Sequence, residues 1–444
     1  MKLRWKTIAA FAAPAVPTSA LGLPLVVYLP PFYAEEMGLG LAMVGTIFMI
    51  TRFWDVFTDP VLGILSDKIK TRLGRRRHWI ILSVPILMLS VYRVFMPQSS
   101  VMGTYLLVWM VLLYVGFTLL SISHLSWGAE LSPDYDDRSR VHGWREFALL
   151  FGMLAVLALP AAIEHFLGAK VEIKIASMGW FVIILLPITV AIAVWMVPER
   201  PVPDPPGMPW QQATQILLKN KPLQRLLLAD LLLGLVPGII GSLYIFFVSY
   251  VMDLAEVASL MLLVYFIAGL LSVPGWIWLS CRLEKHHTFV IAMIYGSITQ
   301  PMLLLVEPGS IRFSMLVLGL YGLASGAGSF LLRSMMADVT DRDNLETGTQ
   351  RTGLYFSLLT LTNKIGYAAA VGITYSMLDW IGFIPSGTNT AQTIEGLKYM
   401  FIFLPIPLTL LAALLMWNFP LNSKRQQELR RLIDERDSVK APVK

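Results

Sequence analysis

The chain has 444 residues, of which 56% are hydrophobic and only 14% are charged. This composition excludes a single soluble domain, because one core could not bury so many apolar side chains. The net charge of +6 and the pI of about 9.2 reflect membrane topology, so no nucleic-acid partner is expected.

Apolar segments of membrane-spanning length follow one another along the chain. A hydrocarbon core roughly 30 Å thick requires about 20 apolar residues per helix. The sequence therefore predicts an all-α integral membrane protein whose surroundings are the lipid bilayer. The first apolar run resembles a signal peptide but continues to about Phe32, which favours a span. The twelve predicted spans are residues 10–32, 40–65, 79–97, 101–129, 140–163, 177–197, 223–251, 257–281, 288–306, 311–335, 351–378 and 396–418.

Basic residues set the expected orientation, since loops rich in lysine and arginine stay in the cytoplasm. With a cytoplasmic N-terminus, all but seven of the 35 lysines and arginines lie on the cytoplasmic side. Two of the seven, Arg52 and Lys364, lie inside spans. Both termini are therefore predicted to be cytoplasmic. The residues on the opposite side are Arg93, Lys170, Lys174, Arg312 and Lys398.

A proline-rich stretch at residues 198–222 separates two similar halves. Ala129, Glu130 and Leu131 after the fourth span are repeated as an Ala-Asp-Val run at 337–339 after the tenth. Two six-helix halves are typical of the major facilitator fold. The predicted parts are a first half at 1–197, a linker at 198–222, a second half at 223–419 and a tail at 420–444.

The stretch RFWDVFTDP at 52–60 places three charges inside the second span. Each costs about 2.5 to 3.5 kcal/mol at a helix centre, which marks it as a functional candidate. At 100° per residue, Arg52, Asp55 and Asp59 share one face of the helix. Two carboxylates one turn apart favour capture of a proton or a small cation. The alternative is a static Arg52–Asp55 salt bridge that only packs the bundle, which would leave Asp59 without a partner.

Polar residues in three other helices are candidates for a central site. In the eleventh span, Thr360 and Lys364 belong to one polar face, and Lys364 is expected to pair with Asp55 or Asp59 unless it snorkels to the interface. His124 in the fourth span is expected to bind substrate or carry a proton, or else to be satisfied by a neighbouring helix. Ser121 lies three residues before it. Arg145 in the fifth span is a candidate substrate anchor, or a marker of the cytoplasmic boundary.

The loop GILSDKIKTRLGRRRHW at 63–79 resembles the signature between helices two and three of major facilitator proteins. Asp67 is placed to pair with Arg75, Arg76 or Arg77 and to form a conformational latch between the two halves. Alternatively, these arginines only set the membrane topology and bind anionic lipid headgroups.

The motifs together resemble one family over nearly the whole length. RFWDVFTDP, TRLGRRRHWI, ELSPDYDDRSR with the following Arg145, and MADVTDRDNLETG leading to GLYFSLLTLTNK are similar to the glycoside-pentoside-hexuronide:cation symporters, the family of melibiose permease. The resemblance implies that Asp55 and Asp59 bind the coupling cation, H⁺ or Na⁺. It further implies that Arg145 contacts a sugar and that Lys364 couples the two sites, with Arg52 nearby.

Departures from the family pattern bear on the substrate and on the ion. The two sugar-binding acids of melibiose permease fall here on Ser19 and on about Ile122. Thr58 replaces the amide between the two cation-binding acids, which favours protons over sodium. Trp127 is a candidate to stack on a sugar ring, or an interfacial tryptophan. A sugar or glycoside-like solute is expected, with an amphipathic solute such as a lysolipid as the alternative.

Other classes of protein lack support in the sequence. There is no HExxH, GxSxG, paired cysteine or Walker motif, so an enzyme or an ATP-driven pump is not expected. The glycines of GLASGAGSF at 322–330 indicate close helix packing inside the membrane. A non-transporting receptor or assembly factor is the remaining alternative. We expect a monomer without cofactors in the bacterial inner membrane.

Overall fold

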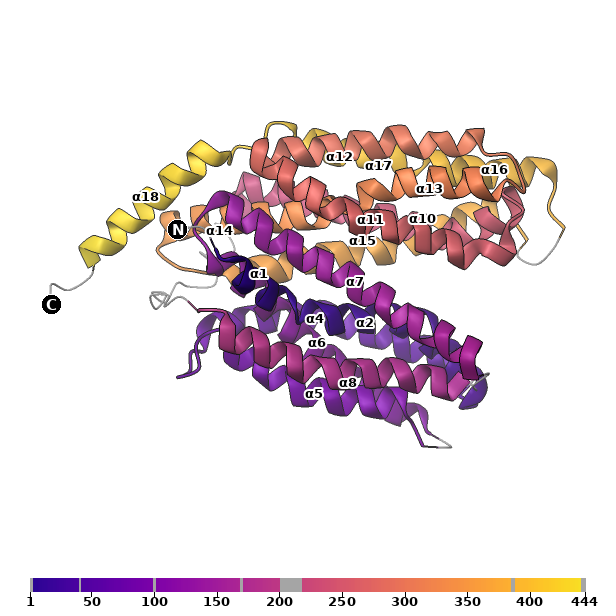
Figure 1. Cartoon of the computed structure of the whole chain (residues 1–444), viewed down its shortest axis with the longest axis horizontal. Helices are drawn as coiled ribbons and strands as arrows, with labels where there is room; N and C mark the ends of the chain where they lie inside the picture. Colours follow the sequence, from indigo (N-terminus) through magenta and orange to yellow (C-terminus); the bar gives the residue numbers. More distant parts are fainter. Residues whose placement is uncertain are drawn as a thin grey trace. The chain divides into compact units, whose positions relative to one another are not determined.

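The computed structural model describes residues 3–39, 41–98, 101–167, 171–199, 218–384 and 388–440. The elements named in these residues are all helices (Figure 1). The chain forms two compact units. The first unit joins residues 1–206 to 343–357, and the second joins 207–342 to 358–444. The role of residues 198–222 as the linker between the halves stays a prediction.

The N-terminal part of the chain contains eight α-helices and one short π-helix in its described residues. They are α1 (Trp5–Ala12), α2 (Ala15–Val27), α3 (Leu29–Pro31), η1 (Phe32–Glu36), α4 (Leu41–Lys68), α5 (Arg77–Phe95), α6 (Gly103–Leu131), α7 (Tyr135–Leu167) and α8 (Val171–Met196). Pro14 separates α1 from α2, because proline cannot donate the next helical hydrogen bond.

The C-terminal part is built in the same way. Its elements are α10 (Lys221–Phe246), η2 (Phe247–Val251), η3 (Ala255–Val257), α11 (Ala258–Arg282), α12 (Lys285–Thr299), η4 (Gln300–Leu305), α13 (Ile311–Ser325), α14 (Gly328–Thr347), α15 (Thr352–Trp380), α16 (Ala391–Phe403), α17 (Pro405–Trp417) and α18 (Ser423–Lys440). Asn220 caps α10 by accepting from the amide of Leu223, and Pro405 begins α17 where α16 ends.

Eight stretches in the described residues are long and apolar enough to cross a membrane. They coincide with predicted spans three, four, six to ten and twelve. The other four predicted spans are also helical, in α1 to α3, α4, α7 and α15. The total of twelve spans and the cytoplasmic termini stay predictions.

Within the first unit, α4 and α5 pack against α6, α5 also against α8, and α2 against α7. Leu87 of α5, Leu106 and Leu113 of α6, and Leu186 of α8 are fully buried in the core of this unit. These packed helices hold the polar face of α6 against α4.

Within the second unit, α11 packs closely along α13. A Cβ atom on Gly326 would lie 2.5 Å from the carbonyl oxygen of Gly269, and one on Gly322 would overlap the backbone of Tyr265. The prediction that GLASGAGSF serves close helix packing is confirmed, since only glycine fits at both positions.

Acidic residues of the second unit hold the C-terminal helix α18. Glu284 accepts a hydrogen bond from the backbone amide of Ser423 over 2.9 Å. Asp341 of α14 accepts hydrogen bonds from Gln426 and from Arg430, whose Nε lies 2.8 Å away. Leu429 and Ile433 are buried on the same face of the helix. The spacing of three and four residues brings all four side chains to one stripe, which makes α18 an amphipathic helix.

Candidate functional site

Asp59 of α4 is a fully buried carboxylate inside the first unit. The hydroxyl of Thr118 on α6 donates a hydrogen bond to its Oδ1 atom over 2.8 Å. A carboxylate removed from water must be paired or neutralised, so a buried acid at this position is a candidate to take up a cation or a proton. Asp59 therefore has the chemistry expected of a coupling site.

The neighbours of Asp59 on α4 are only partly described. The hydroxyl of Thr58 donates to the carbonyl oxygen of Trp54 at 3.2 Å, so its proton is directed to the backbone. The side chains of Arg52 and Asp55 lie outside the described part of the structure, although both residues belong to α4. Their predicted roles, and the static pairing between them, stay predictions.

The polar face of α6 extends from the Asp59 site toward Arg145. Thr118, Ser121 and His124 follow one another at intervals of three residues, which places them along one side of the helix. Sequence analysis identified Ser121 and His124 but missed Thr118, although the same spacing could have indicated it. The hydroxyl of Ser121 is buried, and the described residues provide it with no hydrogen-bond partner. A buried hydroxyl of this kind indicates a place where a ligand or water binds.

His124 and Arg145 form a buried pair between α6 and α7. Nε2 of His124 lies 2.7 Å from the carbonyl oxygen of Phe11, and Nε of Arg145 donates to Nδ1 of His124 over 3.3 Å. Because Nδ1 accepts, the ring is neutral and its proton lies on Nε2. In this arrangement His124 orients the Arg145 guanidinium. Phe11, a residue that sequence analysis did not single out, orients the ring in turn.

Two predicted substrate residues of the first unit are occupied by protein contacts. The Ser19 hydroxyl donates to the carbonyl oxygen of Val16 over 2.9 Å. The Trp127 ring is buried, its Nε1 donates to the carbonyl oxygen of Pro198, and the guanidinium of Arg77 lies 5.7 Å from its centroid. Direct contact of Ser19 or Trp127 with a solute stays a prediction.

Lys364 and Thr360 lie on α15 in the part that belongs to the second unit, and both are half-buried. Thr362 donates to Asp230 of α10 over 3.1 Å, which fixes the rotation of α15 about its axis. At 100° per residue, Lys364 projects about 200° away from Thr362, on the side of α15 opposite to α10. The expected pairing of Lys364 with Asp55 or Asp59 stays a prediction.

Asp67, at the cytoplasmic end predicted for α4, is the centre of an ionic network in the first unit. Its Oδ1 atom lies 3.1 Å from Nη2 of Arg75 and 2.6 Å from Nη2 of Arg76. The carboxylate also accepts from the backbone amides of Gly353 and Leu354, at 2.8 and 2.9 Å. These amides belong to the first turn of α15, so the carboxylate caps that helix and interacts favourably with its dipole.

Two further acids complete the network, and sequence analysis assigned neither of them to it. Glu130 at the end of α6 accepts from Arg76 over 2.7 Å. Glu199 accepts from the backbone amides of Arg75 and Arg76, both over 2.6 Å. Arg77, the third predicted latch residue, donates to the carbonyl oxygen of Val197 and lies beside Glu199. The loop between α4 and α5 is thus held by Glu130, by Glu199 and by the carbonyl oxygen of Val197.

The protonation of the two buried arginines in this network follows from the groups that surround them. Burial alone would lower the pKa of Arg76, but the carboxylates of Glu130 and Asp67 raise that pKa above its usual value. The pKa of Arg75 is lowered by burial and by the neighbouring Arg76. An arginine starts from a pKa so high that it stays protonated at neutral pH even after such a decrease.

Two glycines allow Asp67 to reach the beginning of α15. A Cβ atom on Gly353 would lie 2.5 Å from the carbonyl oxygen of Gly63 and 2.9 Å from Oδ1 of Asp67. A Cβ atom on Gly63 would lie 2.7 Å from the hydroxyl oxygen of Ser357. Real Cβ atoms do not approach this closely, so both positions require glycine.

The second unit contains the counterpart of the Arg76–Glu130 pair. Nζ of Lys285 lies 2.6 Å from the carboxylate of Asp338, and both side chains are fully buried. Asp338 occupies the position of Glu130 in the internal repeat, whereas Lys285 begins α12 as Arg77, the neighbour of Arg76, begins α5. The two ion pairs thus share the position of the acid, and their basic partners differ by one residue.

Two units of long apolar helices with buried charges define a multi-pass membrane transport protein. A family model described as MFS/sugar transport protein matches residues 10–423, so the chain belongs to this family of the major facilitator superfamily. The resemblance to the glycoside-pentoside-hexuronide:cation symporters and the major facilitator fold are thereby confirmed. Members of the family are transporters, so the expectation that the chain is not an enzyme is confirmed as well.

The chain is also similar to individual transporters over most of its length. The chain is 24% identical over 452 residues to the glucuronide carrier protein homolog of Escherichia coli K12, covering 99% of this chain and 97% of that protein. It is 23% identical to the sodium-dependent lysophosphatidylcholine symporter 1 of Xenopus tropicalis, covering 93% and 86%. A crystal structure of the Escherichia coli fucose:proton symporter has a TM-score of 0.68 over 94% of this chain and 98% of that protein, at 14% identity.

Proposed function

We propose that the chain is a secondary active transporter of the bacterial inner membrane that couples movement of a sugar or glycoside-like solute to that of H⁺ or Na⁺. The observation that carries the proposal is the continuous polar face of α6. It begins at the buried Asp59 carboxylate, which Thr118 contacts, and leads through Ser121 to the His124–Arg145 pair. This face of α6 thus contacts both the candidate cation residue Asp59 on α4 and the candidate solute anchor Arg145 on α7, in a family of sugar transporters.

The cation occupies the Asp59 site, where Asp55 and Thr58 on the same helix are the further candidate ligands. Neutralising Asp59 lowers the cost of its burial and allows Lys364 to change partners, with Arg52 as the fixed positive charge nearby. Thr118 turns its hydroxyl oxygen toward Na⁺, or keeps donating to Asp59 when the carboxylate is ionised. The hydroxyl of Thr58 donates its proton to the carbonyl oxygen of Trp54, which leaves the oxygen lone pairs of Thr58 able to contact a cation.

The solute binds against Arg145, with Ser121 and the residues of α15, Thr360 and Lys364, as further contacts. His124 positions Arg145 and does not carry the proton, because both of its ring nitrogens are engaged. The cation and the solute raise each other's affinity by the same factor, as linkage between two sites requires. The protein works as a monomer that alternates access between the two sides of the membrane.

The network around Asp67 is the conformational latch of this cycle. Asp67 lies in the last turn of α4, Arg75 and Arg76 lie in the loop that follows, and Arg77 begins α5. The amides that Asp67 caps begin α15, a helix that starts in the residues of the first unit and continues into those of the second. Opening of the cytoplasmic side therefore requires that Asp67 release these amides, after which Arg75 and Arg76 still have Glu130.

An amphipathic solute is the second candidate. Ser19 lies where a sugar-binding carboxylate is found in melibiose permease, so one polar contact to a galactoside is missing. A relative of the chain over most of its length is a lysophosphatidylcholine symporter. A lysolipid would engage Arg145 with its phosphate and place its acyl chain along apolar surface.

Uptake into vesicles tests the proposal. The purified protein is reconstituted, and labelled fucose, a glucuronide, an aryl glycoside and lysophosphatidylcholine are offered under separate proton and sodium gradients. We expect one gradient to drive accumulation of one solute class, and we expect Asp59→Asn to abolish that dependence while facilitated exchange persists. Accumulation that is independent of both gradients, or intact coupling in Asp59→Asn, would refute cation-coupled transport.

A further inference from the structure

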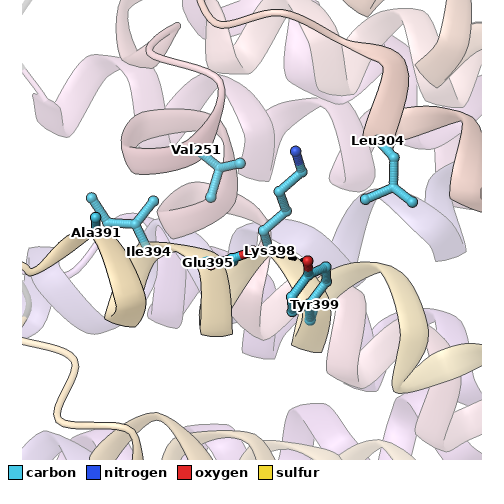
Figure 2. A pocket seen from close by; sticks show the side chains of 7 residues that line it. All are labelled: Val251, Leu304, Ala391, Ile394, Glu395, Lys398 and Tyr399. Carbon is cyan, nitrogen blue, oxygen red and sulfur yellow. Dashed lines mark hydrogen bonds between the residues drawn. The ribbon is translucent and has the colours of Figure 1, made fainter.

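A pocket of about 390 Å³ lies in the second unit, on helices that the proposed transport cycle does not use. It is formed by the end of η2, the end of η4 and the first two turns of α16 (Figure 2). The ends of η2 and η4 precede loops predicted to lie outside the cytoplasm, and the beginning of α16 follows such a loop. The lining residues are Val251, Leu304, Ala391, Ile394, Glu395, Lys398 and Tyr399.

Lys398 extends its ammonium group between Val251 and Leu304 (Figure 2). In the described part of the chain it has no hydrogen bond and no ion pair, and it is half-buried. A snorkelling lysine would direct its charge to open water. Here the side chain lies between the apolar side chains of Val251 and Leu304, with room for an anion beside its ammonium group. Lys398 is also one of the few basic residues on the side where the positive-inside rule disfavours them.

Glu395 contributes the opposite charge to the same pocket. Its Oε1 atom accepts a hydrogen bond from the Tyr399 hydroxyl over 2.8 Å, which turns the carboxylate away from Lys398. The two ions are one helical turn apart but lie farther from each other than an ion pair requires. The pocket therefore offers one cation without a partner among the described residues and one anion held by Tyr399, each with room for a group of the opposite charge.

Two contacts next to the pocket join the three segments that form it. The side-chain amide of Gln300 donates to the carbonyl oxygen of Phe401 over 2.9 Å, which ties η4 to α16. The rings of Phe247 and Phe401 are stacked with centroids 4.1 Å apart, which ties η2 to the same helix. The three segments that line the pocket are thus joined directly below it.

An exposed apolar stripe begins at the pocket and follows α16 and α17. Tyr399, Phe403, Leu410, Leu414 and Trp417 lie within about 60° of one another around the helix axis, and each is exposed. The stripe is about 27 Å long at 1.5 Å per residue, close to the roughly 30 Å of the hydrocarbon core. Its end at Tyr399 therefore lies at the depth of the lipid headgroups.

We infer that this pocket binds the headgroup of a zwitterionic phospholipid with a primary ammonium group, that is, a phosphatidylethanolamine. The phosphate pairs with Lys398 and the ammonium donates hydrogen bonds to Glu395, while the acyl chains follow the apolar stripe. An anionic phosphatidylglycerol would satisfy Lys398 but would meet Glu395 with no positive group. A phosphatidylcholine has no N–H to donate to the carboxylate. Charge and hydrogen bonding thus select one headgroup.

Native mass spectrometry of the purified, delipidated protein tests this inference without any transport measurement. Dioleoyl phosphatidylethanolamine, phosphatidylglycerol and phosphatidylcholine are titrated separately in detergent. A charge-assisted hydrogen bond that is lost corresponds to about a tenfold loss of affinity. We expect the first lipid to bind about tenfold more tightly than the others, and we expect Lys398→Gln to weaken it about tenfold. Glu395→Gln should abolish the preference over phosphatidylglycerol.

The matched control is Arg312→Gln, which removes an exposed cation from the second unit that does not line the pocket. This variant should bind all three lipids as the unchanged protein does, and Lys398→Arg should retain most of the binding. Equal affinity of Lys398→Gln and Arg312→Gln, or no headgroup preference in the unchanged protein, would overturn the inference. The outcome is independent of whether uptake is coupled to a cation.

Discussion

Thr118 of α6 donates a hydrogen bond to Asp59 of α4 over 2.8 Å, and both side chains are buried. This contact joins the candidate cation site to the helix that also carries the candidate solute site. A cation that displaces or reinforces the contact acts on the face of α6 where Ser121 and His124 lie. Thr118 thus links the candidate cation residue Asp59 directly to the helix that carries Ser121 and His124.

Removing the Thr118 hydroxyl should change the affinity of the cation site. Thr118→Val keeps the shape but leaves Asp59 without this donor, at a cost of about 1 to 3 kcal/mol. If the ion is Na⁺, its concentration for half-maximal uptake should rise at least fivefold, because the site loses an oxygen ligand. If the ion is H⁺, the concentration should fall, because the ionised carboxylate loses a donor. Thr118→Ser, which keeps the hydroxyl, is the matched control. Equal cation dependence in the two variants would show that the hydroxyl does not serve the site.

His124 should affect the solute and leave the cation dependence unchanged. His124→Phe keeps a ring but removes the acceptor of Arg145 and the donor to Phe11. We expect the KM for the solute to rise about tenfold, as for loss of a hydrogen bond to a charged group. The activation constant for the cation should not change. A shift of pH dependence without a change in solute KM would instead assign His124 to proton transfer.

Asp67 should stabilise the state in which α15 is capped. Asp67→Asn leaves Arg75 and Arg76 buried with less negative charge, and loss of one partner of a buried ion pair costs about 3 to 5 kcal/mol. The midpoint of thermal unfolding in detergent should therefore fall by several degrees. Lys68→Gln, an exposed neighbour at the end of α4, should leave it unchanged. Similar midpoints for the two variants would argue against the latch.

Gly353→Ala should act on the same network as Asp67→Asn. The added Cβ atom would overlap the carbonyl oxygen of Gly63 and push the first turn of α15 away from Asp67. The double variant should be destabilised by much less than the sum of the two single effects, because the contact is lost only once. Additive changes in the unfolding midpoint would place the two residues in separate networks.

The Lys285–Asp338 pair should behave as a single buried unit. Lys285→Met removes the ammonium partner of the buried Asp338 carboxylate and should cost about 3 to 5 kcal/mol, measured as a lower unfolding midpoint. The double variant Lys285→Met, Asp338→Leu removes both charges and should recover most of the loss. If the double variant is less stable than either single one, the pair contributes more than charge neutralisation.

The sequence predicted the helical architecture and the family because both depend on local signals. Long apolar runs, the charges of RFWDVFTDP and the arginine-rich loop after Asp67 are all visible within a few residues of one another. The pairing of Asp67 with Arg75 and Arg76 was predicted in this way, and the structure contains both ion pairs. Their role as a latch remains a prediction.

The partners that sequence analysis missed are distant in the chain. Glu130 lies 54 residues from Arg76 and was noticed only as part of a repeat, while Glu199 binds amides rather than a charged side chain. Thr118 is an ordinary residue in an apolar helix, and only packing of α6 on α4 gives it a carboxylate to contact. The direction of the Trp127 ring likewise depends on tertiary packing, which places Pro198 and Arg77 around it.

The attachment of α18 through Asp341 has a practical consequence for protein production. A chain truncated near Pro420 would remove Gln426 and Arg430 and leave their acidic partner in the interior. Such a truncation should lower expression and yield in detergent. An affinity tag or fluorescent fusion placed beyond Lys440 keeps this anchor and should report faithfully on folded protein.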